Sequence, residues 1–376
     1  MRLSRRIRSI EASGTSTLFD AVEKRRRSGQ PVINLAIGEP DFFPAAGIID
    51  ATTAALANGQ TRYTNTSGLE ELRNRLGDKP DGYSPENIII TNGAKQGLYG
   101  AFQVLLDPGD EVILPSPHWV SFGHQIRLAG GTPVVVPTVR HQLDVPAIEA
   151  ALTASTRAIL INSPNNPTGA VYPKSALDQV AGLAETHDLT IVSDETYDTF
   201  VYNGTKGDPC PWPDEIRHRL IRIRSFSKQF SMTGFRVGCA IGPDSVISAM
   251  GRLQGHVTGN VCTFAQHGAL AALSLDPDEH DEHCLDLMRK RDLAHQWADD
   301  IFSCIKPEGA FYLFPDVRQH LAPGQTSADF AAWLLERAGV AVVPGEDFGA
   351  SGYIRICFAV PENILTDGLK RIKEVL

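Results

Sequence analysis

The chain is poor in the residues that build metal centres and disulfide frameworks. Its 376 residues include six cysteines, which are scattered without a C-x-x-C spacing. Such a set indicates neither a metal site nor a disulfide pattern. Reduced, buried thiols are typical of proteins in reducing compartments, so we predict a cytoplasmic protein that holds no metal.

Positive charge and long apolar runs are also scarce. The net charge is −9, and the densest basic run covers only residues 24–27, in a predicted surface helix. Nucleic acid is therefore not an expected partner. The apolar stretches are too short to span a bilayer, and residues 1–10 lack the apolar core of a secretory signal. We therefore expect no membrane association.

The nucleotide-binding signatures are missing as well. The first predicted strand is not followed by G-x-G-x-x-G, and the chain contains no G-x-x-x-x-G-K-[ST]. Both patterns place glycine backbone against phosphate groups. Their absence argues against a nicotinamide enzyme and against a nucleoside triphosphatase.

The middle of the chain alternates short apolar runs with helical patterns. Strands are predicted at residues 88–90, 111–114, 133–136, 158–162, 190–193 and 220–225, with helices at 94–106 and 175–187. This alternation indicates an α/β fold, in which a mostly parallel sheet carries helices on both faces as three layers.

The last ninety or so residues have a different pattern. Helices are predicted near 287–301 and 327–338, around short strands at 341–343 and 353–357. This combination is typical of a smaller α+β domain, which we expect the first forty residues to join. We predict a large domain of residues 41–286 and a small domain of residues 1–40 plus 287–376.

Polar residues follow three of the predicted strands. Asn162 leads into Ser-Pro-Asn-Asn-Pro-Thr-Gly, Ser193 into Asp-Glu-Thr-Tyr, and Ser225 into Phe-Ser-Lys. In open α/β sheets, ligands bind beyond the carboxyl ends of the strands. We therefore expect an amide, a carboxylate, a phenol and an amine to converge at one edge of the sheet.

Lys228 and Asp194 have the most specific chemistry of this group. Burial at a strand end lets a lysine lose its proton, and a neutral amine is what a Schiff base requires. A carboxylate at such a place could cap a helix, or it could pair with the protonated pyridine nitrogen of pyridoxal 5'-phosphate (PLP). Because both residues stand at the same predicted edge, we expect PLP as cofactor, with Lys228 as its attachment point.

Other residues fit a PLP site, although each has a structural alternative. Asn166 precedes Pro167, so it either forms a turn or donates to the phenolate oxygen of the cofactor. Tyr197 either donates to the same oxygen or belongs to the core. Trp119 either packs in the core or stacks on the pyridine ring.

Binding a phosphate group and binding a substrate carboxylate both need positive charge or free N–H groups. Gly93 and Ala94 open a helix directly after a strand, which suits a phosphate but is also a common turn. Ser225 and Arg236 are the other phosphate candidates. Arg355 lies inside an apolar strand, where it either clamps a substrate carboxylate or forms an internal salt bridge.

Nine segments together resemble the class I aminotransferases of PLP fold type I, over nearly the whole chain, and look most like prokaryotic aspartate aminotransferases. The segments are residues 38–42 (GEPDF), 63–64 with 68–73 (YT, GLEELR), 91–96 (TNGAKQ), 117–121 (PHWVS), 163–170 (SPNNPTGA), 193–197 (SDETY), 225–238 (SFSKQFSMTGFRVG), 344–349 (PGEDFG) and 353–358 (YIRICF). Each segment alone is modest, but their number and order make a chance match improbable.

The resemblance implies a role for each matching residue. The implied catalytic residues are Lys228, Asp194 and Tyr197. The implied cofactor-binding residues are Gly93, Ala94, Lys95, Trp119, Asn166, Asp194, Tyr197, Ser225, Lys228, Arg236 and Tyr63. The implied substrate-binding residues are Gly38, Asn166, Arg355, Thr15 and Lys95. Tyr63 resembles a residue that reaches the cofactor phosphate of a partner subunit, so a homodimer with shared active sites is implied, and a cis peptide bond is predicted between Asn166 and Pro167.

The implied activity is the transfer of an amino group from an L-amino acid to a 2-oxo acid, in a ping-pong cycle between PLP and pyridoxamine phosphate. Thr15 and Lys95 resemble a pair that holds a distal carboxylate, which points to aspartate or glutamate; Lys95 could instead be a solvated helix residue.

A PLP-dependent lyase, cyclase or oxidase of the same fold is the main alternative, because the same residues serve those reactions. A PLP-sensing regulator is disfavoured, since residues 38–42 come too early for a preceding DNA-binding module.

The sequence also departs from the family pattern at three places. The stretch between residues 73 and 88 is several residues short, His118 stands where relatives commonly have tyrosine, and residues 255–260 match weakly. All three could line or support the substrate entrance, so the identity of the substrate is the least constrained prediction.

Overall fold

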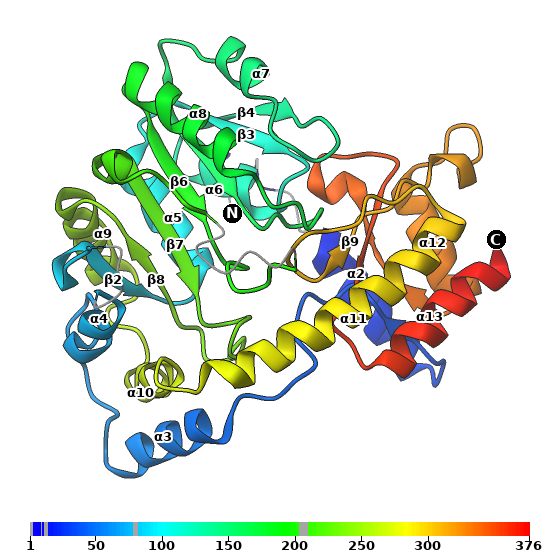
Figure 1. Ribbon diagram of the computed structural model, residues 1–376, viewed down its shortest axis with the longest axis horizontal. Coiled ribbons are helices and arrows are strands. Elements are labelled where there is room, and N and C mark those ends of the chain that lie inside the picture. Colours follow the sequence, from blue (N-terminus) through cyan, green and yellow to red (C-terminus); the bar gives the residue numbers. More distant parts are fainter. Residues whose placement is uncertain (1–2, 9, 11–13, 78–81, 203–209) are drawn as a thin grey trace.

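The computed structural model describes residues 3–8, 10, 14–77, 82–202 and 210–376. Within them lies a seven-stranded sheet with the order β2-β8-β7-β6-β5-β3-β4 (Figure 1). The strands are β2 (Ile88–Thr91), β3 (Glu111–Ser116), β4 (Thr132–Pro137), β5 (Thr156–Asn162), β6 (Thr190–Asp194), β7 (Leu220–Ser225) and β8 (Gly238–Ile241). The pairs from β7 to β4 are parallel, whereas β8 is antiparallel to both neighbours. The predicted mostly parallel sheet is confirmed.

Apolar side chains bury this sheet on both faces, as the alternation along each strand requires. Val112 and Leu160 lie in the cluster of one face, while Ile113 and Ile159 lie in the cluster of the other. The first face is covered by α5 (Ala94–Leu105), α6 (Ser121–Leu128) and α9 (Asp244–Val257), and the second by α7 (Val145–Ala150) and α8 (Lys174–Thr186). These helices give the three-layer α/β arrangement that the sequence predicts.

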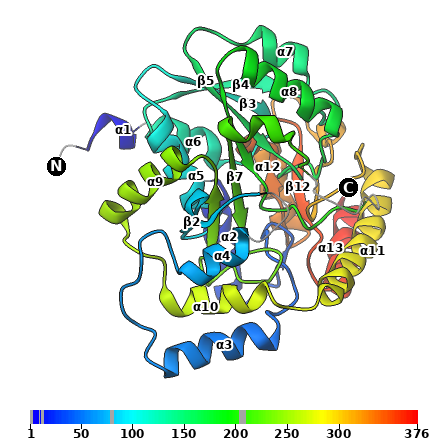
Figure 2. The same cartoon turned by 60° about the vertical axis from the view of Figure 1, so that its left-hand side comes forward.

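A further group of helices extends the large unit beyond β2. It consists of α3 (Ala46–Ala57), α4 (Glu70–Gly77) and α10 (Thr263–Ala272). Their apolar residues, including Ile48 and Leu72, pack with Ile88 and Ile90 of the edge strand. Helices α3 and α10 lie side by side at the base of the molecule (Figures 1 and 2).

The second unit joins residues from the two ends of the sequence. Strand β1 (Ile33–Asn34) pairs in parallel with β10 (Val340–Ala341), and one hydrophobic cluster contains Leu35 together with Leu365. The other strands form the order β11-β12-β9, which is antiparallel. The elements are β9 (Tyr312–Leu313), β11 (Val343–Pro344), β12 (Ile354–Cys357), α2 (Gly14–Arg27), α11 (Pro277–Ile301), α12 (Ser327–Arg337) and α13 (Glu362–Val375).

Helix α11 links the two units. It begins at Pro277, well before the start near residue 287 that the sequence predicts, and continues to Ile301. In Figure 1 it runs from the neighbourhood of α10 to the neighbourhood of α13. The short elements that remain are α1 (Arg5–Arg8), η1 (Pro85–Asn87), η2 (Asp214–Arg219), η3 (Arg318–His320) and η4 (Gly345–Phe348).

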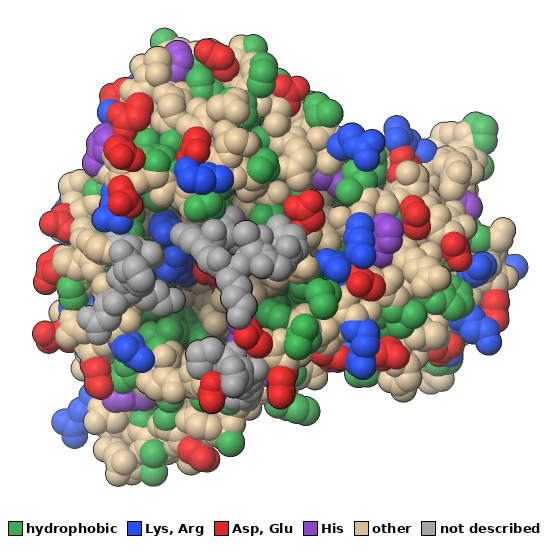
Figure 3. Space-filling model, in the orientation of Figure 1, with side chains coloured by type: hydrophobic (Ala, Val, Ile, Leu, Met, Phe, Trp, Pro, Cys, Tyr) green, Lys and Arg blue, Asp and Glu red, His purple; other side chains and the backbone are tan. Residues whose placement is uncertain are grey.

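The cysteines are all free thiols, and they differ in exposure. Cys262 is exposed and Cys284 is partly buried, so the expectation of buried thiols is wrong for Cys262, which precedes helix α10 at the surface. Among the described residues, none of the helices combines the length and apolarity needed to cross a bilayer. Figure 3 shows acidic and basic side chains interspersed over the face seen in Figure 1.

Candidate active site

A cavity of about 490 Å³ lies at the carboxyl ends of β5, β6 and β7, where the sheet meets the second unit. This is the place that the chain topology of an open parallel sheet favours for a ligand. Its lining comprises Ala36, Ile37, Gly38, Glu39, Ala94, Lys95, Trp119, Val120, Asn162, Asn166, Asp194, Thr196, Tyr197, Ser225, Ser227, Lys228, Arg236, Tyr312, Phe348 and Arg355. Most of the residues that the sequence singles out are therefore brought to one cavity.

Lys228 follows β7 and reaches across the cavity to the second unit. Its Nζ donates a hydrogen bond of 2.6 Å to the carbonyl oxygen of Gly38. Burial lowers the pKa of the amine to about 8, against the opposing effect of the Glu39 carboxylate. A substantial part of this amine is neutral near pH 8, and it can therefore act as a nucleophile or as a base.

Asp194 is the last residue of β6 and is buried. Burial raises the pKa of its carboxyl to about 6, although two hydrogen bonds from Thr196 to Oδ1 oppose that effect. Because these hydrogen bonds only partly offset the cost of burying the charge, the carboxylate would be stabilised by a cationic group in the cavity.

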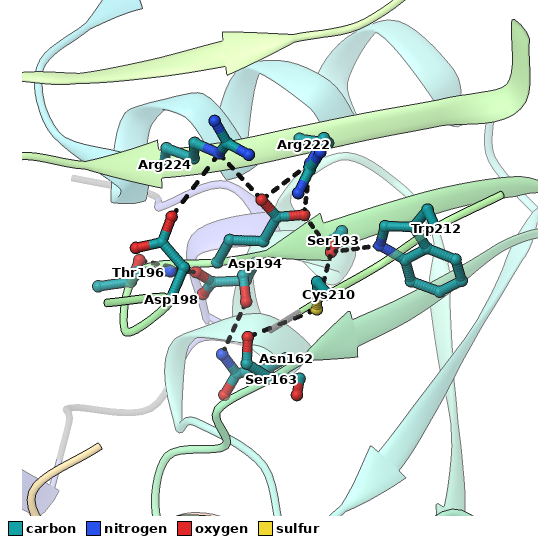
Figure 4. Close-up of polar contacts among 11 residues, drawn as sticks. Asn162, Ser163, Ser193, Asp194, Thr196, Asp198, Cys210, Trp212, Arg222 and Arg224 are labelled. Carbon is teal, nitrogen blue, oxygen red and sulfur yellow. Dashed lines mark hydrogen bonds and ion pairs between the residues drawn. The ribbon is translucent and has the colours of Figure 1, made fainter. Parts of the chain in front are cut away.

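Behind Asp194 lies a buried cluster of charges that the sequence analysis did not identify. The fully buried Glu195 accepts hydrogen bonds from the Nε atoms of Arg222 (2.8 Å) and Arg224 (3.0 Å). Figure 4 shows both arginines extending from β7, with Arg224 also paired to Asp198. Burial alone raises the pKa of Glu195, but the two arginines outweigh it and hold that pKa below its usual value.

Ser193 connects this charge cluster to its surroundings. Its hydroxyl donates to Glu195 (2.9 Å) and accepts from the indole nitrogen of Trp212 (3.1 Å), as Figure 4 illustrates. On the other side, the side-chain amide of Asn162 donates to the backbone oxygen of Asp194. The ends of β5 and β6 are therefore held by hydrogen bonds, which fixes the floor of the cavity.

Arg355, on β12, enters the cavity from the second unit. One terminal nitrogen donates to Oδ1 of Asn166 and the other to the carbonyl oxygen of Ala36, both at 2.8 Å. Among the described residues, its Nε is buried without a hydrogen-bond partner. The guanidinium also lies 4.3 Å from the ring centroid of Tyr312 and 5.0 Å from that of Phe348. A planar anion such as a carboxylate matches this arrangement.

Asn166 is buried beside Arg355, and its backbone N–H donates to Oδ1 of Asn162 at 2.9 Å. The peptide bond between Asn166 and Pro167 is cis, as predicted. Tyr197 is buried in the wall of the same cavity, and its hydroxyl lies 2.7 Å from that of Tyr312. Amide and phenol groups can thus both reach a polar ligand in the cavity.

Lys95 and Trp119 lie together at the side of the cavity formed by α5 and the segment before α6. The Lys95 Nζ is 4.9 Å from the centroid of the Trp119 ring, a cation–π distance. Burial lowers the pKa of Lys95, and the positive charge of Arg236 lowers it further. The amine is therefore partly buried. An anionic ligand in the cavity would offset the repulsion between the positive charges of Lys95 and Arg236.

The start of α5 adjoins Arg236. Gly93 precedes the helix with φ of 76°, a conformation that favours glycine. A Cβ atom there would also come within 2.7 Å of the Arg236 guanidinium. Ala94 and Ser225 line the cavity next to this guanidinium. Free N–H groups at a helix start, a hydroxyl and a cation are the groups that bind phosphate.

Among the predicted site residues that the structure describes in full, Tyr63 and Gly93 do not line the cavity, although Gly93 adjoins Arg236, which does. The side chain of Tyr63 is 95% exposed. Thr15 lies in α2, but its side chain is outside the described part of the structure. Conversely, the cavity contains Glu39, Thr196 and Tyr312, which sequence reasoning did not select. The described residues contain no cluster of metal-ligating side chains.

Comparisons with known proteins give matches over the whole chain. Residues 30–372 match the family "Aminotransferase class I and II". A probable aspartate/prephenate aminotransferase of Aquifex aeolicus is 39% identical over 100% of this chain and 98% of its own length. The aspartate aminotransferase of Bacillus subtilis is 38% identical, over 99% and 98%. A structure of the Thermus thermophilus aspartate aminotransferase with maleate superimposes with a TM-score of 0.94, at 38% identity and with full coverage of both chains.

Proposed function

Because the chain belongs to the family of class I and II aminotransferases, we propose that it transfers amino groups between acidic amino acids, such as aspartate or glutamate, and 2-oxo acids. The chain is a PLP-dependent aminotransferase of fold type I, and the lyase, cyclase and oxidase alternatives are not favoured. The observation that carries the proposed substrate class is that two cations, Arg355 and Lys95, line the same cavity as Lys228. A dicarboxylic amino acid needs one cation for each carboxylate.

The residues of the cavity fit PLP. The Asp194 carboxylate, whose pKa burial raises, matches a protonated pyridine nitrogen. The start of α5, with Gly93, Ala94, Ser225 and Arg236, matches the phosphate. When bound, PLP supplies an electron sink that makes the Cα–H bond of the substrate acidic. The cofactor would be held by covalent attachment to Lys228, by stacking of Trp119, and by Asn166 and Tyr197 at the phenolate oxygen.

Lys228 moves the proton in the proposed reaction. With the cofactor bound, the free amine of Lys228 would take up the proton from Cα of the substrate and would later release it again. The pKa of about 8 suits both tasks, because the amine can gain or lose a proton within about one pH unit of neutrality. The negative charge of Asp194 would stabilise a protonated pyridine nitrogen.

The substrate is oriented by groups from both units. Arg355 binds the α-carboxylate, with Asn166 and the Gly38 backbone beside it, so that the Cα–H bond faces Lys228. Lys95 binds the distal carboxylate, and Thr15 assists it. This orientation supplies the proximity that a proton transfer needs.

We further propose a cytoplasmic homodimer with shared active sites. The high exposure of Tyr63 supports this, since a tyrosine that lies outside its own cavity is free to serve the phosphate of a partner subunit. The six free cysteines support a reducing compartment.

The pairing of β1 with β10 supports a small domain of residues 1–40 plus 287–376 beside a large domain of 41–286, with α11 spanning the boundary.

The first test is an absorbance spectrum of the purified protein, before and after adding single amino acids. We expect a visible band that borohydride removes, that is missing in Lys228→Ala, and that aspartate or glutamate converts to the pyridoxamine phosphate spectrum. The exposed Lys174, paired with Asp178, provides the matched control Lys174→Ala, which should keep the band. Conversion only by amino acids without a second carboxylate would contradict the proposed substrate class. Release of ammonia without pyridoxamine phosphate would favour a lyase or an oxidase.

A further inference from the structure

Tyr312 stands between two groups that the proposed mechanism uses, although it has no role in that mechanism. It lies on β9, is fully buried, and lines the cavity. Its hydroxyl is 2.7 Å from the hydroxyl of Tyr197, and its ring centroid is 4.3 Å from the Arg355 guanidinium. One side chain therefore contacts both a residue proposed for the cofactor and the residue proposed for the substrate carboxylate.

The two phenols must share one hydrogen bond. Burial raises the pKa of Tyr197 and of Tyr312 well above their usual value, so both hydroxyls keep their protons at neutral pH. Each hydroxyl has a single proton, and only one of the two can point along the contact between them. Whichever phenol accepts in this contact has its own proton left for another acceptor.

The surroundings decide which phenol that is. The Tyr312 hydroxyl is packed against Gly38 so closely that a Cβ atom at Gly38 would overlap it. Tyr197 lines the same cavity as Asn166 and Lys228, where the proposed cofactor would offer an anionic phenolate oxygen. Donation from Tyr197 to an anion is stronger than donation to a neutral phenol. With the cofactor bound, the proton in the phenol contact must then come from Tyr312.

We propose that Tyr312 is a positioning residue with two functions: its hydroxyl donates to Tyr197 and so directs the Tyr197 proton to the phenolate oxygen of the cofactor, while its ring supports the Arg355 guanidinium. This inference rests on the proposed roles of Tyr197 and Arg355. A hydroxyl that accepts one hydrogen bond donates a stronger one, so Tyr312 strengthens the donation by Tyr197.

This arrangement has a spectroscopic consequence. A donor at the phenolate oxygen reduces the negative charge that would hold a proton on the neighbouring Lys228 nitrogen. It therefore lowers the pH midpoint of the absorbance change of the cofactor-loaded enzyme. Removing the donor, or weakening it, must raise that midpoint. A tyrosine with a purely structural role would leave the midpoint where it is.

The test compares four variants of the loaded enzyme in a spectroscopic pH titration. Tyr197→Phe should raise the midpoint by roughly one pH unit, because it removes a hydrogen bond to an anion. Tyr312→Phe should raise the midpoint by a few tenths of a pH unit. The effect is smaller because the hydrogen bond from Tyr312 only strengthens the one that Tyr197 donates. The double variant should match Tyr197→Phe, because Tyr312 acts through Tyr197. Tyr202→Phe is the control, since that buried phenol donates to the backbone of Ala310 instead.

The ring function is tested by the affinity for maleate, a dicarboxylate. Tyr312→Phe keeps a ring under Arg355 and should leave the dissociation constant unchanged. Tyr312→Leu removes the ring and should raise the dissociation constant about tenfold, the expected loss for a desolvated cation–π contact. Equal affinities for the Leu and Phe variants would overturn this half of the inference.

The outcomes also separate this inference from the proposed function. A midpoint that moves in Tyr197→Phe but not in Tyr312→Phe overturns the role of Tyr312 and leaves the proposed function intact. A midpoint that moves in neither variant overturns both assignments. A double variant that shifts further than Tyr197→Phe shows that Tyr312 acts by another route, which also contradicts the inference.

Discussion

The two sides of the cavity are built on different principles. On the sheet side, the ends of β5 and β6 are joined by hydrogen bonds, and the buried charge of Glu195 is matched by two arginines from within the chain. On the side of the second unit, Arg355 uses two of its nitrogens for Asn166 and Ala36, while its buried Nε has no partner among the described residues. The Glu195 charge on the sheet side is thus satisfied from within the chain, whereas the other side retains a donor for a ligand.

This difference predicts which kinetic constant each side controls. A side that is complete without substrate acts mainly on the chemical step, whereas a side with an unsatisfied donor acts mainly on substrate binding. The following substitutions and conditions test this division, in order of decreasing expected effect.

The largest effect is expected on the sheet side, for Asp194→Asn. The amide keeps the shape of the side chain but removes the charge opposite the pyridine nitrogen. Loss of one partner of a buried pair costs about 3–5 kcal/mol, so kcat should fall about 10²- to 10⁴-fold with little change in KM. Steady-state kinetics measure both constants, and the exposed Asp178→Asn serves as the control. A fall in kcat of less than tenfold would contradict the assignment.

On the opposite side, Arg355→Lys should act chiefly on KM. Lysine keeps the positive charge but cannot form the paired hydrogen bonds of a guanidinium. The loss of about 1.5–3 kcal/mol predicts a KM for aspartate that is about 10- to 100-fold higher. A change confined to kcat would mean that Arg355 does not bind the substrate in its ground state.

The pH dependence of cofactor attachment tests the state of Lys228. Burial lowers the pKa of its amine from 10.5 to about 8, and only the neutral amine can react. The rate at which cofactor-free enzyme gains the visible band should therefore rise about tenfold per pH unit below this pKa and level off above it. Stopped-flow absorbance measures the rate. A rise that continues to pH values near 10 would indicate a solvated, ordinary lysine.

The smallest effect is expected for Lys95→Met, and it should fall on KM although Lys95 lies on α5 at the sheet side, because its proposed role is to bind the substrate. The lysine is only partly buried, and a partly exposed ion pair contributes about 1 kcal/mol or less. The KM for aspartate should rise about two- to fivefold, while the KM for alanine, which has no distal carboxylate, should stay the same. Equal changes for both amino acids would show that Lys95 acts on the cofactor or on Trp119 rather than on the substrate side chain.

The sequence predicted the sheet well because parallel strands such as β5 and β6 are buried on both faces and contain runs of apolar residues. Strand β8 was not predicted, because it is short, begins with Gly238, and directly follows a loop. The first part of α11 was not predicted either, because residues 277–283 are mostly charged or polar and show no apolar periodicity. Both elements are specified by packing against other parts of the chain.

The candidate site was predicted to a similar extent. Residues that directly follow apolar strands, such as Asp194 and Lys228, could be found from local sequence. Tyr312 and Glu39 could not, because they reach the cavity only through the packing of the second unit. A signal for the buried charge cluster was present, since Arg222 and Arg224 interrupt an apolar strand and such residues need buried partners.

The charge cluster also constrains how the chain folds. Glu195 enters the core at the end of β6, and its cations enter on the adjacent β7. A partly folded state with only one of these strands in place would bury charge of a single sign, which costs about 3–5 kcal/mol relative to the paired state. We therefore expect neither strand to be stable in the core without the other. The floor of the active site therefore forms cooperatively, as one folding unit.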